Sequence, residues 1–306
     1  MRQHTLHDPT DKPFQDLSEP NVGFISKLFV QALFPYRSTT ELVRQIRQGP
    51  ETITVTATEG MPYGKYPRLI MAYIVTQAYH QWRQAEQGLI SKEEARRIPL
   101  GNSLNEFLRA IGVVRHHGAG GKLIASIRTQ VDRLAAASIR IETTHKTTLS
   151  TRRQAVPTID ISHDHALWLA PTADQQALAE SYILLTERFC EIIADSPIPI
   201  DLNILLALTK PRAMDLYGYI SVKKFWLNHR TASEWTLSWE SLAMHFSPPK
   251  LTTWAHKRDF RHEIHKCLED ITLLWPDVGA EITPAGLLLH DGPLSVPAKP
   301  KRPLRY

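Results

Sequence analysis

The fold assignment starts from residues 121–162, GKLIASIRTQVDRLAAASIRIETTHKTTLSTRRQAVPTIDIS. The first part predicts a helix over about 121–138, because its apolar residues recur at helical spacing on one side: Leu123, Ile127, Val131, Leu134 and Ala135. The second part contains two β-like segments around a basic, threonine-rich turn. We therefore expect an amphipathic helix followed directly by a β-hairpin.

The residues before this stretch predict further elements in a definite order. ETITVTATEG (51–60) alternates with a period of two, which indicates a strand that ends at Glu59-Gly60. A mostly buried helix opens near Pro67, and Ser103 caps a short helix that Gly112 closes. Helix, short helix, turn, helix and hairpin is the order of a winged helix, which presents its third helix to the DNA major groove and its hairpin to the backbone.

The second half of the chain predicts the same order. Its expected elements are a strand over 181–193, an amphipathic helix from about Asp201, a buried helix over 211–227, a helix capped by Ser238, a helix beginning near Lys257, and a hairpin over 280–296. The hairpin carries turn signals at 284–286 and 291–292. In the helix near Lys257, one face is apolar: Phe260, Ile264, Cys267, Leu268 and Ile271.

The predicted fold class is therefore α+β, with two tandem winged-helix domains that are helix-rich and carry small β-hairpin wings. We expect a flexible N-terminal arm over 1–20, a first domain over 21–165, a second domain over 175–296, and a basic disordered tail over 297–306. The domain boundary falls near 160–175.

Composition limits the class of protein. Hydrophobic residues make up 42% and charged residues 22% of the 306 residues, as in globular proteins, and the longest apolar run, 69–75, is too short to span a bilayer. The polar N-terminus contains no secretion signal, so we expect a cytoplasmic bacterial protein that does not bind membranes. Cys190 and Cys267 belong to no CxxC pair and are predicted to be buried without a disulfide or zinc.

Positive charge is concentrated in one segment. Between Arg115 and Arg153 there are eight Lys or Arg against Asp132 and Glu142, a balance of +6 in a chain whose net charge is +5. Such a segment is typical of a phosphate-binding surface, although a solvated basic face without a partner is the alternative.

The predicted DNA-binding residues come from the polar faces of the two recognition helices and from the first hairpin. On the first helix and hairpin they are Lys122, Ser126, Arg128, Thr129, Arg133, Lys146, Arg152 and Arg153. On the second helix they are Lys257, Arg258, Arg261, His262, His265 and Lys266. Which arginine reads a base and which binds a phosphate is left open by the sequence.

Three motifs suggest enzymes. GAGGK (118–122) departs from a phosphate loop, because His116 occupies the first glycine position and Leu123 replaces the magnesium-binding hydroxyl. HEIH (262–265) spaces its histidines by three, whereas a zincin helix requires four. His163-Asp164-His165 resembles the metal-binding strand of a rolling-circle nickase, with Tyr182 as its nucleophile, but the central residue there is apolar. We therefore expect no catalytic residue, no metal and no cofactor.

The chain resembles the plasmid-encoded RepA replication initiator family. The resemblance rests on PYGKYPRLIMAYIVTQA (62–78), LGNSLNEFLRAIGV (100–113), the glycines at 120–121, IRTQVDRLAAASI (127–139) and PIPIDLNILLALTKPRAMDLYGYI (197–220). It implies an initiator that binds repeated origin DNA (iterons), opens the origin and recruits host replication proteins, namely the host initiator and the replicative helicase. It also implies control of plasmid copy number and a homodimer off DNA. A winged-helix transcriptional repressor and a rolling-circle nicking endonuclease are the alternatives.

Overall fold

The computed structural model describes two compact units. The described residues are 20–31, 34–48, 51–101, 103–114, 120–146, 151–155, 158–166, 181–195, 197–229, 232–246 and 252–296. Unit 1 comprises those between Phe24 and Pro197, and unit 2 comprises those from Ile198 onward together with residues 20–23. The division thus lies after the boundary expected near 160–175. The predicted tail and all of the predicted arm except Pro20 lie outside the described residues.

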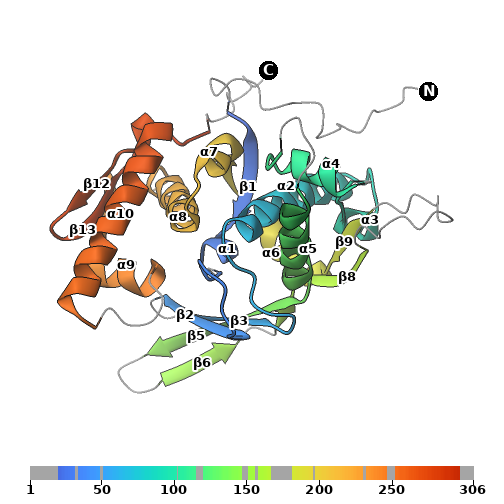
Figure 1. Cartoon of the computed structure of the whole chain (residues 1–306), viewed down its shortest axis with the longest axis horizontal. Helices are drawn as coiled ribbons and strands as arrows, with labels where there is room; N and C mark the ends of the chain where they lie inside the picture. The colour runs from blue at the N-terminus through green and yellow to red at the C-terminus, as the bar shows by residue number, and fades with distance from the viewer. Residues whose placement is uncertain are drawn as a thin grey trace, which may run out of the picture. The chain divides into compact units, whose positions relative to one another are not determined.

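Unit 1 is built around the long helix α2 (Tyr66–Glu86), which contacts α3 (Lys92–Arg96), α5 (Gly121–Ala135) and α6 (Glu187–Asp195) (Figure 1). As predicted, α2 opens with Pro67 in its first turn, where a missing N–H costs nothing. Ile70, Ile74 and Val75 are among its buried residues. The short elements α1 (Lys27–Gln31) and β1 (Val22–Ser26) precede it.

Two antiparallel sheets complete unit 1. The larger has the order β2 (Val43–Gln48), β3 (Glu51–Ala57), β5 (Ala137–Lys146) and β6 (Thr151–Ala155), and β7 (Ile159–Asp160) also pairs with β5. Alternation along β3 buries Ile53, Val55 and Ala57, as the period of two predicts. The smaller sheet has the order β4 (Arg97–Pro99), β9 (Tyr182–Leu185) and β8 (Ser162–Ala166).

The predicted helix, short helix, helix and hairpin are all present in unit 1. In α4 (Leu104–Ala110), the Ser103 hydroxyl accepts the Glu106 amide at 3.2 Å, and Gly112 follows the helix at a φ of 70°. The hairpin is formed by β5 and β6, with Lys146 opposite Thr151. The turn between them lies outside the described residues.

Two predictions for unit 1 need correction. The strand predicted over 181–193 is wrong in its second part, since β9 ends at Leu185 and α6 follows. Phe189, Cys190 and Ile193 recur at helical spacing and are fully buried, and the Phe189 amide donates to the Thr186 hydroxyl at 3.2 Å. The helix predicted over 121–138 ends at Ala135, because the next residues pair with β3 as part of β5.

Unit 2 begins with β10 (Pro197–Asp201) and α7 (Leu202–Ala207), which Asp201 caps. The buried helix α8 (Pro211–Leu227) follows, then β11 (Glu234–Ser238), α9 (Trp239–Phe246) and α10 (Trp254–Leu274). The short η1 (Pro276–Val278) leads into β12 (Ala280–Thr283) and β13 (Gly286–His290). The sequence did not predict β11, which pairs with β13 so that β13 lies between β11 and β12.

The core of unit 2 lies between its helices and this three-stranded sheet. Ser238 caps α9 as predicted, since its hydroxyl accepts the Ser241 amide at 3.2 Å. Trp239, Leu242 and Phe246 are buried on one side of α9. The whole structure is therefore a mixed α/β protein of helices and small antiparallel sheets. Over the described residues, no helix is both long enough and apolar enough to cross a membrane.

Candidate nucleic-acid interface

Helix α5 presents a polar surface opposite its buried side. Ile127, Val131 and Leu134 are fully buried, whereas Lys122, Arg128 and Thr129 are exposed. Ser126 is half-buried. The Thr129 hydroxyl donates to the Ala125 carbonyl at 2.9 Å, so it lies along the helix. The exposed residues can reach a ligand laid along this face.

Arg133 differs from the other predicted residues of α5. Its Nη1 donates to the Met61 carbonyl at 3.2 Å, and its guanidinium carbon lies 5.4 Å from the Tyr63 ring centroid. The Tyr63 amide in turn donates to the buried Gln130 side chain at 2.9 Å. Arg133 therefore ties α5 to the loop that follows β3, which limits its reach toward a ligand.

The three hairpin residues lie on β5 and β6. Arg152 pairs with His145 and Arg153 with Thr144, while Lys146 ends β5. The structure places these three residues on one hairpin.

Helix α10 separates apolar and polar residues as predicted. Phe260, Ile264, Cys267, Leu268 and Ile271 are buried, and the six predicted DNA-binding residues of this helix are all exposed. The helix starts earlier than the sequence indicated, at Trp254, because the Thr253 hydroxyl accepts the His256 amide at 3.2 Å and caps it. This adds a tryptophan that is 74% exposed to the first turn.

Charge is not uniform along α10. The first half of the helix contains three cations, Lys257, Arg258 and Arg261, and two acids, Asp259 and Glu263. The second half contains Lys266 and two acids, Glu269 and Asp270, and His265 Nδ1 lies 3.1 Å from Glu269. The cationic part of this surface is therefore the N-terminal half of the helix.

Tryptophans accompany both arginines of that half. The guanidinium carbon of Arg258 lies 5.2 Å from the Trp254 ring centroid, and that of Arg261 lies 5.0 Å from the Trp239 ring. Cation–π contacts of this kind restrict the guanidinium to a few orientations. Each tryptophan is the first residue of its helix, Trp239 in α9 and Trp254 in α10.

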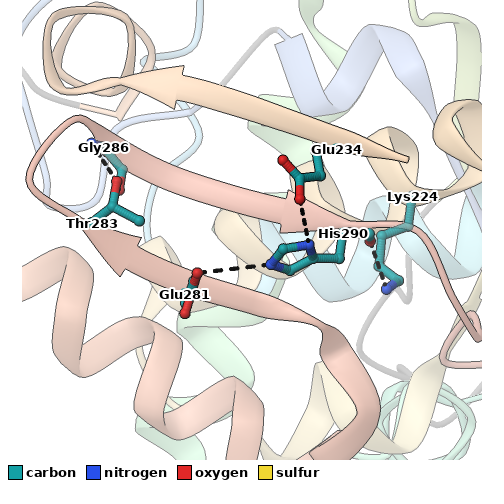
Figure 2. A network of polar contacts seen from close by, with 6 residues as sticks. All are labelled: Lys224, Glu234, Glu281, Thr283, Gly286 and His290. Atoms are coloured by element: carbon teal, nitrogen blue, oxygen red, sulfur yellow. Dashed lines mark hydrogen bonds and ion pairs between the residues drawn. The ribbon is translucent and has the colours of Figure 1, made fainter. Parts of the chain in front are cut away.

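The second hairpin is anchored to α8 through Lys224 (Figure 2). This side chain is fully buried, and its ammonium donates to the carbonyls of Val278 and His290 at 2.8 and 3.1 Å. Burial lowers the pKa of Lys224, and the nearby Asp291 and Asp277 carboxylates oppose that effect.

On the same sheet, a histidine bridges both neighbouring strands (Figure 2). His290 on β13 lies with Nδ1 3.6 Å from Glu234 of β11 and with Nε2 3.7 Å from Glu281 of β12. Residues 280–290 include no Lys or Arg. This hairpin therefore lacks the Lys and Arg residues that the first hairpin carries.

The structure also places the motifs that suggested enzymes. His163, Asp164 and His165 lie on β8, where His165 pairs with Ile183, while Tyr182 pairs with Ala166. Tyr182 is covered by the Arg97 guanidinium at 3.5 Å. Over the described residues there is no group of three or more His, Cys, Asp or Glu that could hold a metal ion. Residues 115–119 of the glycine-rich segment lie outside the described part, and Lys122 is in the first turn of α5.

Burial raises the pKa of the Cys190 and Cys267 thiols to about 12. Both are fully buried, as predicted, and both are free thiols. Thiols held in their neutral form are poor nucleophiles and poor metal ligands. They belong to the two cores and not to a site.

Comparison with known proteins identifies the family. Residues 61–241 match the family described as plasmid encoded RepA protein, which is more than half of the chain. The chain therefore belongs to the plasmid RepA replication initiator family, and the resemblance seen in the sequence is confirmed. No curated protein sequence matches the chain.

Two solved structures are similar in fold. A selenomethionine crystal structure of domains 2 and 3 of RctB aligns with a TM-score of 0.49 and 12% identity, covering 79% of this chain and 81% of that one. A second crystal structure of RctB domains 2–3 aligns with a TM-score of 0.47 and 12% identity, covering 83% of each chain.

Proposed function

We propose that this plasmid replication initiator binds repeated origin duplexes through α5 and α10, helps to open the origin, and recruits the host initiator and replicative helicase. One observation carries the proposal: each unit contains an amphipathic helix that buries its apolar side and exposes cations on the other. Phosphates attract such a surface, and a groove accepts a helix of this width. Family membership supplies the biological setting.

The winged-helix assignment is part of this proposal. In unit 2 the order α8, β11, α9, α10, β12, β13 and the pairing of β11 with β13 support it. Unit 1 supports it less directly. Its hairpin pairs with β3, and β4, the strand that precedes α4, pairs with β9 instead of with the hairpin. In both units the proposed recognition helix is the one just before a hairpin.

DNA binding without covalent chemistry is favoured over a nicking reaction. A nickase of the proposed type needs two histidines and a tyrosine to converge on one metal. Here Tyr182 pairs with Ala166 on β8, and the Arg97 guanidinium lies over its ring at 3.5 Å. The ring is therefore already in contact with a cation of the protein.

A repressor on the same fold would bind DNA by occupancy alone, and a homodimer off DNA fits either function. The purified protein should be incubated with a supercoiled plasmid that carries the origin and with Mg²⁺. Permanganate-reactive thymines at the origin would support the initiator, a footprint alone would support the repressor, and a covalent protein–DNA adduct would identify a nickase.

The proposed surface is tested by replacing Lys122 and Arg128, one at a time, with Ala. Removing one phosphate interaction should reduce the salt dependence of log K by about 0.9, and removing one base interaction should cost about 1–3 kcal/mol and relax specificity. Arg83→Ala is a matched control, because Arg83 is exposed on α2 and pairs with Glu86 at 2.8 Å. Unchanged binding by both variants would remove α5 from the interface.

A further inference from the structure

Arg258 is held more tightly than the other cations of the α10 surface. Its guanidinium carbon lies 5.2 Å from the Trp254 ring centroid, and the guanidinium hydrogen-bonds Asp259. Both Nε and Nη2 donate to the same Asp259 oxygen, at 3.1 and 2.9 Å. The side chain is nevertheless 60% exposed, so this fixed guanidinium faces solvent.

Such an arrangement suits a base better than a phosphate. Of the five N–H groups of a guanidinium, Asp259 takes two, and the others include both N–H groups of Nη1. A guanine offers O6 and N7, two neutral acceptors, to a guanidinium of fixed direction. A phosphate is an anion, and the adjacent carboxylate of Asp259 would repel it.

Arg261 and Lys257 provide the contrast on the same helix. The guanidinium of Arg261 lies over the Trp239 ring, and the Glu240 carboxylate interacts electrostatically with both Arg261 and Lys257. Within the described residues neither cation has a hydrogen-bonded carboxylate of the kind that Asp259 provides for Arg258. Lys257 is an exposed ammonium, which can contact guanine O6 and N7 but lacks the planar fork that fixes the direction of a guanidinium.

We propose that Arg258 is the residue of unit 2 that reads a guanine, and that Trp254 and Asp259 are the positioning residues that orient it. Trp254 supports the guanidinium plane, and Asp259 fixes its rotation and disfavours phosphate. This inference rests on the proposed function, because it assumes that α10 lies in a major groove.

The test is selection of binding sites from a library of random-sequence duplexes by the full chain. The wild type should select a motif with a guanine that Arg258→Ala no longer selects. Arg258→Lys should select it more weakly than the wild type, because lysine keeps the charge and can contact the guanine edge but loses the fork. On the selected site, the preference for that guanine should fall roughly 5- to 160-fold in Arg258→Ala and by a smaller factor in Arg258→Lys. The salt slope of Arg258→Lys should stay unchanged.

The positioning residues have distinct readouts. Asp259→Asn should strengthen binding to unselected duplexes, because it removes a negative charge. It should also weaken the guanine preference, because it removes the carboxylate that orients the Arg258 guanidinium. Trp254→Ala should weaken the preference without changing the salt slope, and Trp254→Phe should restore part of it. Arg188→Ala is the control, because Arg188 is equally exposed on α6 and pairs with Glu191 at 3.2 Å.

The outcomes separate the two proposals. If the wild type selects no motif, both the proposed function and this inference fail. If Arg258→Lys selects the same motif at the same strength, or if Arg258→Ala weakens all sequences equally and lowers the salt slope by about 0.9, only the guanine assignment fails. Circular dichroism melting of every variant confirms that the fold is retained.

Discussion

Replacing Lys224 with Met should destabilise unit 2 strongly, although Met matches the length and flexibility of the lysine stem. The ammonium donates to Val278, His290 and, at 3.5 Å, Asp291. Hydrogen bonds from a charged donor contribute about 1.5–3 kcal/mol each, and the two shorter ones carry most of the effect. Removing the cost of burying the charge offsets part of this loss, so we expect a net loss of about 3 kcal/mol.

The measurement is urea unfolding followed by tryptophan fluorescence, because Lys224 lies 5.7 Å from the Trp275 ring. The matched control is Lys223→Met, since the neighbouring Lys223 is half-buried and its ammonium lies over the Tyr219 and Trp235 rings. It should cost less than about 1 kcal/mol. A destabilisation below about 1 kcal/mol for Lys224→Met would refute the idea that the ammonium holds the hairpin.

The same lysine predicts a dependence on pH with a definite sign. Because burial lowers the pKa of Lys224 in the folded state, the unfolded chain binds more protons between that lowered value and the ordinary value of 10.5. The free energy of unfolding of the wild type should therefore rise with pH in this window relative to Lys224→Met. If the difference in free energy of unfolding between the wild type and Lys224→Met did not change with pH in this window, the lowered pKa of Lys224 would be contradicted.

Three further changes test the local structure. Ser103→Ala removes the hydroxyl that accepts the Glu106 amide, and calorimetry should show a loss of about 1 kcal/mol. Gly286→Ala would place a Cβ 2.0 Å from the Leu237 carbonyl oxygen at a φ of 149°, so the variant should lose the pairing of β11 with β13, seen as lost amide protection in hydrogen exchange; retained protection would disprove this. The Cys190 pKa is raised from 9.0 to about 12, so the unfolded chain releases this proton first, and Cys190 lowers the free energy of unfolding by about 1.4 kcal/mol per pH unit between pH 9 and 12; Cys190→Ala should make the pH dependence shallower by that amount in chemical denaturation, while the contribution of Cys267 remains.

Elements with local signals could be predicted from the sequence. Ser103 and Ser238 cap helices where a Ser precedes an apolar run, and the apolar stripe of α10 is buried as its spacing indicates. The capping box of Ser91 and Glu94, which starts α3, carries the same kind of signal and was missed. These features depend on residues within one or two helical turns.

Features that depend on distant residues could not be predicted. The strand β4 has three residues and exists because it pairs with β9, which is more than 80 positions away. Nothing in the local sequence distinguishes Lys224 from an exposed lysine. Only the fold brings its ammonium to the carbonyls of Val278, before β12, and of His290, at the end of β13. Likewise, α6 follows β9 with only Thr186 between them, and periodicity alone does not separate the two elements.

The charge map of the sequence overstates the phosphate-binding capacity of unit 1. Arg140 pairs with Glu142 at 3.0 Å, and Arg133 bonds the Met61 carbonyl, so these two cations are already engaged within the protein. An engaged cation releases few counterions from DNA, whereas an exposed one that meets a phosphate contributes about 0.9 to the salt slope. Arg140→Ala should therefore leave the slope of duplex binding unchanged, and Lys122→Ala should lower it by about 0.9. If both variants reduced the salt slope equally, the ion-paired arginine of β5 would contact DNA as much as the exposed lysine of α5. The number of cations in the sequence, and not their engagement within the fold, would then determine the salt dependence of binding.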